Sequence, residues 1–291
     1  MKRGHVAIVG LFAAACSGVA NPGPPEPPAH PGDWTCVGKG TTARLEPVQP
    51  RGRFAVALQD ASTHAPVGDL LLAVCALEDE DCATPASQEK ADHTGSATLT
   101  VPVGRSPFDG FVRVSGASIA THYVFLPERE AACPSCALVL PIYTSSALAT
   151  LTKMTGLKLD AKEGLVRVDL QDCAGAPAKD VSVSIGGFNC SESGAMDAGA
   201  RAGVLFRPEG CRKPLVAYAT GGNGSVTRAA LASDATGVAL GFGVAPGRLG
   251  IAALLDGKTI AGAIGFTRGG AVSEFVLRPR FSPAPPLFSQ P

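Results

Sequence analysis

Residues 52–60 read GRFAVALQD and residues 164–172 read GLVRVDLQD, with Gly, Val, Leu, Gln and Asp at matching positions. In both stretches apolar residues alternate with polar or small ones, so that every second side chain faces the same side of a strand. The runs at residues 70–74 and 97–101 alternate in the same way. No helical pattern alternates with these runs, which favours an antiparallel sandwich over a parallel, nucleotide-binding sheet.

Two further pairs of matching segments follow the repeated stretch in the same order. APVGDLLL at residues 65–72 matches APAKDVSV at 176–183, and DHTGSA at 92–97 matches DATGVA at 234–239. The members of the last pair are farther apart by about thirty residues, so we expect an insertion in the second copy, at about residues 186–212. Asp and Gly in these segments suit the tight corners between strands, because Asp hydrogen-bonds to its own turn and Gly accepts positive φ.

The turn segments of the second copy resemble those of the carboxypeptidase regulatory-like, or transthyretin-like, domain. That family begins a strand with Pro-x-x-(Asp/Gly)-Val, as in PAKDV at residues 177–181, and continues with Thr-Asp-x-x-Gly and Val-Pro-Pro-Gly turns. The corresponding turns here are DATG at 234–237 and VAPG at 244–247, and the first copy has VPVG at 101–104. The resemblance implies a seven-stranded, immunoglobulin-like sandwich that usually serves as an accessory or adhesive module and not as an enzyme.

One helix is predicted between the two copies, over residues 146–155, with Ser145 as its cap and Gly156 as its end. Its apolar face would be formed by Leu148, Leu151 and Met154. We therefore expect an all-β chain of two tandem antiparallel β-sandwich domains, immunoglobulin-like or transthyretin-like, joined by a short helical connector. The expected segments are a signal peptide at 1–15, a Pro-rich tether at 16–33, the first sandwich at 34–144, the connector at 145–157, the second sandwich at 158–280 and a Pro-rich tail at 281–291.

The N-terminal residues predict export and attachment of a lipid. Basic residues precede an apolar run at residues 6–15, which is too short to span a bilayer. The run ends in LFAAAC at residues 11–16, which resembles the lipobox of bacterial lipoproteins and implies that Cys16 is acylated. Ser17 after the cysteine implies, in that family, transfer to the outer membrane. An ordinary secretory peptide cleaved after Ala20 is the alternative.

The cysteine count agrees with an exported protein. The chain has nine cysteines, and acylation of Cys16 leaves an even number for disulfides. Cys75 and Cys82 form the most favourable pair, because they would close a hairpin. The remaining cysteines divide unequally, five in the first copy and three in the second, so either one bridge joins the copies or each copy holds a free thiol. Within the second copy, pairing of Cys211 with Cys173 or Cys190 is favoured. The candidate disulfide cysteines are Cys36, Cys75, Cys82, Cys133, Cys136, Cys173, Cys190 and Cys211.

Few residues are spaced for catalysis or metal binding. The histidines His30, His64, His93 and His122 are isolated, and none has metal-ligand spacing. CPSC at residues 133–136 has the spacing of a thioredoxin motif, but the residues after it predict a strand, whereas a reactive thiol needs a helix N-terminus. The acidic run EDED, from Glu78 to Asp81, could bind calcium. A solvated hairpin loop is favoured, because the glycine of a calcium-binding loop is missing.

Charge and composition narrow the class of function. The chain has 25 basic and 25 acidic residues, and this balance argues against binding to nucleic acid. We expect a non-enzymatic envelope lipoprotein without a cofactor or metal, held at the outer membrane only by its lipid, that binds, adheres to or spaces an envelope protein or a surface ligand. A solute- or glycan-binding lipoprotein that uses the insertion is one alternative. A redox protein that uses Cys133 and Cys136 is another.

Overall fold

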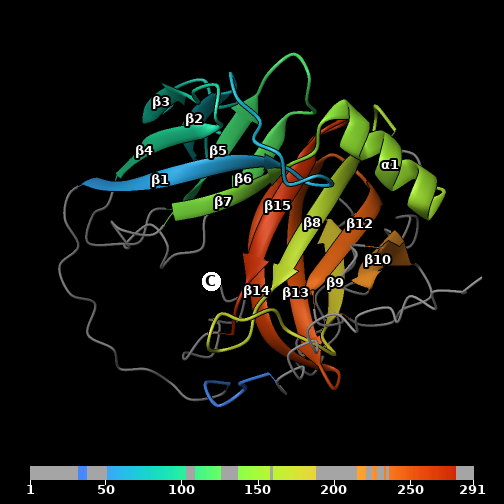
Figure 1. Cartoon of the computed structure of the whole chain (residues 1–291). Helices are drawn as coiled ribbons and strands as arrows, with labels where there is room; N and C mark the ends of the chain where they lie inside the picture. The colour runs from blue at the N-terminus through green and yellow to red at the C-terminus, as the bar shows by residue number, and fades with distance from the viewer. Residues whose placement is uncertain are drawn as a thin grey trace, which may run out of the picture. The chain divides into compact units, whose positions relative to one another are not determined.

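The described part of the chain forms β-strands and one short helix (Figure 1). The computed structural model describes residues 32–37, 51–102, 109–125, 137–157, 160–187, 215–220, 225–227, 233 and 236–279. All of them belong to the compact unit Pro31–Pro291, and Met1–His30 forms a separate unit. Within the described ranges, no helix is long and apolar enough to cross a membrane.

The strands fall into a first half and a second half on either side of the helix. The first half contains β1 (Arg51–Asp60), β2 (Leu71–Ala76), β3 (Ser87–Lys90), β4 (Ser96–Pro102), β5 (Gly110–Ser115), β6 (His122–Phe125) and β7 (Ala137–Ile142). The helix α1 covers Ser145–Thr155. The second half contains β8 (Gly164–Leu170), β9 (Ser182–Gly187), β10 (Leu215–Thr220), β11 (Ser225–Thr227), β12 (Val238–Val244), β13 (Gly247–Leu255), β14 (Lys258–Thr267) and β15 (Val272–Leu277).

The described strands form three sheets, and one of them runs through both halves. Its nine strands have the order β11-β10-β12-β8-β15-β6-β5-β2-β3, and the other two sheets are β4-β1-β7 and β14-β13-β9. The halves meet where β15 runs parallel to β6, from the pair Val272 and His122 to the pair Phe275 and Phe125. The predicted all-β sandwich architecture is therefore confirmed, and the structure adds that one continuous sheet joins the two copies.

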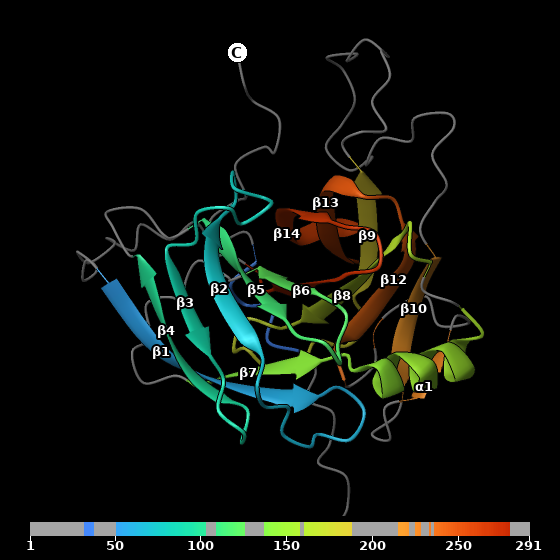
Figure 2. The ribbon, with the colours of Figure 1, turned by 90° about the horizontal axis from the view of Figure 1, so that it is seen from above.

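The two smaller sheets cover opposite faces of the shared sheet (Figure 2). Sheet β4-β1-β7 encloses a first core with β2, β5 and β6. Sheet β14-β13-β9 covers the other face and forms a central core, to which the first half contributes Ala73, Cys75, Cys82, Phe111 and Phe125. Helix α1 covers the face of β8, β12 and β15 that lies opposite this central core. Apolar burial on both faces of the shared sheet thus holds the halves together.

The repeated segments form the same backbone contacts in both halves. The N–H of Leu58 donates to the carbonyl of Gly95 at 2.8 Å, and the N–H of Leu170 donates to the carbonyl of Gly237 at 2.7 Å. Both glycines have positive φ, 77° and 65°. In addition, β1 lies between antiparallel β4 and parallel β7, and β8 lies between antiparallel β12 and parallel β15. The two halves therefore have corresponding strands at corresponding places.

The connector helix lies where the sequence predicts it, with a different cap and a different buried face. Thr144 caps it in place of Ser145, because its side chain accepts from the N–H of Ala147. Gly156 ends the helix at φ 68°, as expected. The fully buried positions are Ala147, Leu151 and Thr155. Met154 is 43% exposed, because the face turned toward the sheet is rotated from the predicted one.

Candidate functional site

The N-terminal segment of the folded unit is fastened to the second half. The backbone N–H of Asp33 donates to the Asp172 carboxylate at 2.9 Å, and the N–H of Cys173 donates to the carbonyl of Asp33 at 2.8 Å. A disulfide joins Cys36 to Cys173, with their Cα atoms 5.8 Å apart. Both cysteines are buried. These contacts fix the chain that follows the Pro-rich stretch to the end of β8.

The end of β15 meets the same point. The Arg278 side chain donates to the carbonyl of Cys173 at 2.7 Å, and the carbonyl of Pro279 lies 3.8 Å from the sulfur of Cys36. We call the group formed by Asp33, Cys36, Asp172, Cys173 and Arg278 the clasp. Because β8 and β15 are parallel neighbours, their C-terminal ends lie together, and the clasp holds the N-terminal segment against both.

The clasp aspartate has a counterpart in the first half. Asp60 and Asp172 occupy matching positions of the repeat, and each uses one carboxylate oxygen to accept N–H groups of its own turn. The second oxygen binds an arriving segment: Asp60 accepts from the hydroxyl of Thr144 at the start of α1, and Asp172 accepts from Asp33. Although partial burial raises it, the pKa of Asp60 is held well below its usual range by hydrogen bonds from Ser62, Thr144 and Thr63.

The observed disulfides decide part of the cysteine pairing. Cys75 is joined to Cys82, the pair that the hairpin spacing favours. Cys173 is joined to Cys36, which excludes the alternative Cys173–Cys211 and leaves Cys190–Cys211 as a prediction, and a bridge does connect the two copies. The sequence could not choose between these partners, because no local signal shows that the segment before the first copy lies against β8. Cys16, Cys133, Cys136, Cys190 and Cys211 lie outside the described residues, as do His30 and most of the predicted insertion.

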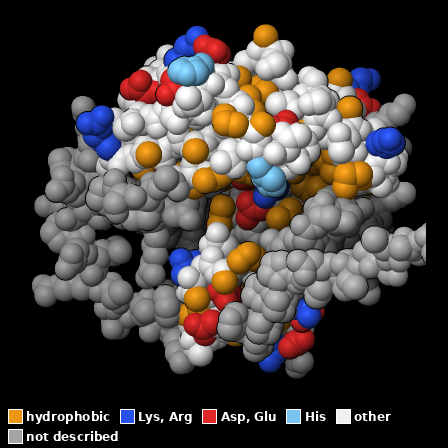
Figure 3. Space-filling view, viewed as in Figure 1, with side chains coloured by type: hydrophobic (Ala, Val, Ile, Leu, Met, Phe, Trp, Pro, Cys, Tyr) orange, Lys and Arg blue, Asp and Glu red, His pale blue; other side chains and the backbone are white. Residues whose placement is uncertain are grey.

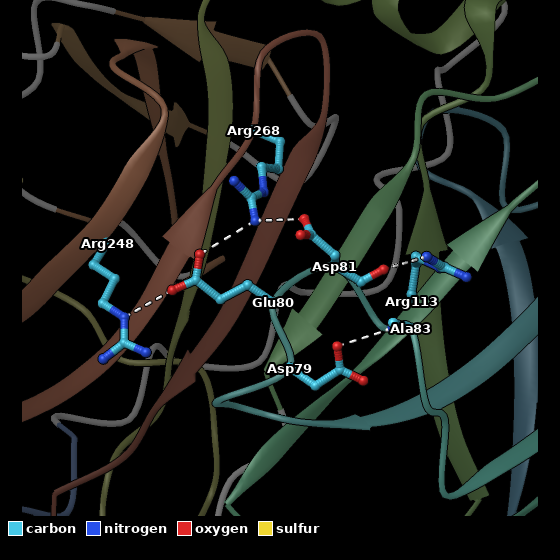
Figure 4. A network of polar contacts seen from close by, with 7 residues as sticks. All are labelled: Asp79, Glu80, Asp81, Ala83, Arg113, Arg248 and Arg268. Atoms are coloured by element: carbon cyan, nitrogen blue, oxygen red, sulfur yellow. Dashed lines mark hydrogen bonds and ion pairs between the residues drawn. The ribbon is translucent and has the colours of Figure 1, made fainter.

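The acidic loop between Cys75 and Cys82 contacts arginines of the second half (Figure 4). Glu80 lies 2.7 Å from Arg248 and 3.2 Å from Arg268, and Asp81 lies 2.9 Å from Arg268. Asp79 instead accepts from the backbone N–H groups of Ala83 and Thr84, which fixes the turn. Among the described residues, no group of three or more His, Cys, Asp or Glu is arranged to hold a metal ion. The loop therefore joins the two halves by ion pairs.

A buried polar cluster lies on the face of the shared sheet near the start of α1. Arg167 on β8 contacts Asp169 at 2.7 Å, Glu274 on β15 at 3.9 Å and the hydroxyl of Tyr143 at 3.4 Å. Burial raises the pKa of Glu274 to about 8, and Arg167 offsets this in part. Burial therefore favours the neutral form of Glu274 beside the Arg167–Asp169 pair.

His122 on β6 lies beside this cluster, against Tyr143. It is fully buried, its Nε2 accepts from the backbone N–H of Tyr143 at 3.0 Å, and its ring stacks on the Tyr143 ring. Burial lowers the pKa of His122 to about 3, so the imidazole is neutral at pH 7. His64 and His93, by contrast, are exposed in turns. The sequence does not reveal this cluster, because His122, Arg167, Asp169 and Glu274 lie in strands that read as ordinary alternation and Tyr143 lies in the link between β7 and α1.

The described surface offers few features that would fix a small ligand. A hollow of about 310 Å³ beside β3 and β4 is lined by Ala86, Ser87, Thr100 and Pro102, which provide neither a charge nor an aromatic ring. On the face shown in Figure 3, charged side chains form scattered small groups of both signs. This pattern is typical of an ordinary solvated surface.

The comparisons with known proteins give only distant likenesses. No family model and no curated protein matches the chain. Among solved structures, the Bacillus anthracis TIE protein is 10% identical over 79% of this chain and 34% of its own, with a TM-score of 0.25. The shaft pilin SpaA of Lactobacillus rhamnosus GG is 10% identical over 79% of this chain and 97% of its own, with a TM-score of 0.23.

A third similar structure is GBS52, the minor pilin of Streptococcus agalactiae. It is 12% identical over 82% of this chain and 100% of its own, with a TM-score of 0.25. This chain thus spans about a third of the Bacillus anthracis protein and nearly the full length of the two pilins. At these identities and TM-scores, nothing about function is transferred from them.

Proposed function

We propose that this chain is a non-enzymatic envelope lipoprotein that binds, adheres to or spaces another protein through surface contacts. The observation that carries this proposal is the clasp. It fixes the chain to a β-rich unit directly after the Pro-rich stretch, through a disulfide and hydrogen bonds. A module that must hold a fixed surface at a distance from its anchor needs such a fixed end.

The anchor in this proposal is a lipid on Cys16. The basic residues, apolar run and LFAAAC motif support it, and Ser17 supports the outer membrane as the destination. The Pro-rich residues between the anchor and the clasp favour an extended conformation of ~3.1 Å per residue, which would separate the folded unit from the membrane. The disulfides agree with an oxidising compartment outside the cytoplasm.

Several described polar residues of the types used in catalysis are engaged in structural contacts. Asp60, Asp79 and Asp172 fix turns, Glu80 joins the halves, and His122 is buried against Tyr143. The turn motifs of the second copy support a relationship to the carboxypeptidase regulatory-like domains, which usually serve as accessory or adhesive modules. We therefore assign the function to the surface of the unit and to protein contacts made there.

Metabolic labelling with palmitate tests the anchor. Labelling should be lost in Cys16→Ala and retained in Cys75→Ala, and only the first variant should leave the membrane fraction. Continued labelling of Cys16→Ala would contradict the proposal.

Cross-linking of the wild-type protein in outer-membrane fractions tests the protein contact. It should capture one defined envelope protein, and Cys16→Ala, released from the membrane, should capture less of it. Turnover of insulin disulfides by the purified protein, lost in Cys133→Ser/Cys136→Ser, would instead establish the redox alternative.

A further inference from the structure

The clasp encloses the whole first half in a covalent loop. Cys36 and Cys173 are separated by 137 residues, and β1 to β7, α1 and also β8 of the second half lie between them. The chain enters the folded unit at Gly32, reaches Cys36, and from there has two routes to the second half. One route is the polypeptide through the first half, and the other is the disulfide.

We propose that the clasp is a load path: tension on the N-terminal segment passes through Cys36–Cys173 into the second half and bypasses the first half. A taut polypeptide route is impossible while the bridge is closed, because the bridge is far shorter than the 137 residues that it spans. Tension then reaches the first half only through its sheet, core and ion-pair contacts with the second half.

The surroundings of the bridge suit this role. Cys36 has no exposed surface and Cys173 is 8% exposed, so a reductant reaches the bridge poorly in the folded state. The hydrogen bonds from Asp33 to Asp172, from Cys173 to Asp33 and from Arg278 to Cys173 cross the same point. Tension on residue 32 must therefore break several contacts of the second half before it reaches any contact of β1.

The second disulfide provides a matched control. Cys75 and Cys82 are only 7 residues apart and lie inside the loop that Cys36–Cys173 closes. Opening Cys75–Cys82 cannot change the length of the load path while Cys36–Cys173 is closed. Opening Cys36–Cys173 should therefore lengthen the unfolded chain, whereas opening Cys75–Cys82 alone should not.

Single-molecule pulling tests the proposal on a chain that starts at residue 17 and carries attachment tags at both ends. Fully unfolded Cys36→Ser/Cys173→Ser should be longer than the oxidised wild type by roughly 450–490 Å, the span of the 137 enclosed residues at ~3.3–3.6 Å each. Cys75→Ser/Cys82→Ser should have the length of the wild type. Equal lengths for all three proteins would overturn the proposal.

A second measurement does not depend on folding of the variants. Wild-type protein held extended in dithiothreitol should lengthen by the same large step when Cys36–Cys173 is reduced, and then by a small step for Cys75–Cys82. Tryptic digestion without reductant should also link the peptide that ends at Lys39 to the peptide of residues 168–179. Absence of the large step, or linkage of Cys36 to another peptide, would refute the load path. Neither measurement involves the lipid, so failure here leaves the anchored-module proposal standing.

Discussion

Gly95 and Gly237 occupy matching positions in the two copies, and at both positions the backbone leaves little room for a side chain. Each has positive φ, and a Cβ atom would approach the carbonyl oxygen of Leu58 to 2.6 Å or that of Leu170 to 2.5 Å. The same strand residue donates its N–H to the carbonyl of the glycine. The Asp-x-Thr-Gly signature of the sequence therefore has a physical cause in both halves: a left-handed backbone and a close approach to a central strand.

Gly237→Ala should lower the free energy of unfolding by about 1–3 kcal/mol, because alanine at this φ is strained and its methyl group meets a fixed backbone oxygen. Gly186→Ala is the matched control. Its Cβ would meet nothing within 4 Å, and its φ is not in the left-handed region, so stability should stay the same or rise slightly. Denaturant unfolding of the two variants measures this. Equal stabilities would show that the corner is not strained.

His122 and Glu274 are both buried, and they make the free energy of unfolding depend on pH in opposite senses. His122 has a folded pKa of about 3, below its unfolded value of 6.5, so its contribution is present above pH 6.5 and is lost on acidification toward pH 3. Glu274 has a folded pKa of about 8, above its unfolded value of 4.5. Its contribution is present below pH 4.5 and is lost as pH rises toward 8. Between pH 6.5 and 8, Glu274 is the member of this pair that changes protonation in the folded state.

In that window the wild type should lose about 1–2 kcal/mol of unfolding free energy relative to Glu274→Gln, because one pKa unit corresponds to about 1.4 kcal/mol and glutamine does not titrate. Urea titrations at pH 6.5, 7.2 and 8 measure the difference. Glu89→Gln, on exposed β3, serves as the control and should follow the wild type. A difference between wild type and Glu274→Gln that stays constant with pH would contradict burial of a neutral carboxyl group.

At the scale of single elements, the alternating runs were sufficient to predict the central strands. Phe54, Val56 and Leu58 on β1 are buried, as are Val166, Val168 and Leu170 on β8. The helix was predicted within one residue of its observed start, since its length and its terminal glycine are local signals. Its cap was not, because Thr144 is selected by its tertiary contact with Asp60 as well as by its position.

Leu170→Ala should destabilise the protein by about 2–5 kcal/mol, because the side chain is 2% exposed in the central core and its loss leaves a cavity. Val139→Ala on β7 removes apolar atoms from a side chain that is 52% exposed, and should change stability by about 0.5 kcal/mol or less. Thermal unfolding of both variants compares them directly. A Leu170→Ala variant that melts like Val139→Ala would show that the alternation of β8 does not face a core.

At the scale of the whole molecule, the contact between the halves had no signature in the sequence. Strand β6 is only four residues long, and its parallel partner β15 begins at Val272, far along the chain. Tyr123 and Phe125 on β6 pack with Phe266, which precedes β15, so the junction is an aromatic cluster assembled from both halves. Hydrophobic periodicity reports which face of a strand is buried, but it does not identify a distant partner.

The shared sheet, the central core, the clasp and the ion pairs of Glu80 all join the same two halves. Individually, the exposed ion pairs contribute little. The apolar contacts of Phe111 and Phe125 with Phe266 contribute more, because they remove large aromatic surfaces from water. The duplicated sandwiches should therefore unfold as one cooperative unit and not as two independent domains.

Differential scanning calorimetry of the oxidised protein, with Leu58→Ala in the first half and Leu170→Ala in the second, tests this claim most directly. We expect one transition whose calorimetric and van't Hoff enthalpies agree, and which either substitution shifts as a whole to lower temperature. Two resolved transitions, of which Leu58→Ala moves only one and Leu170→Ala only the other, would contradict it.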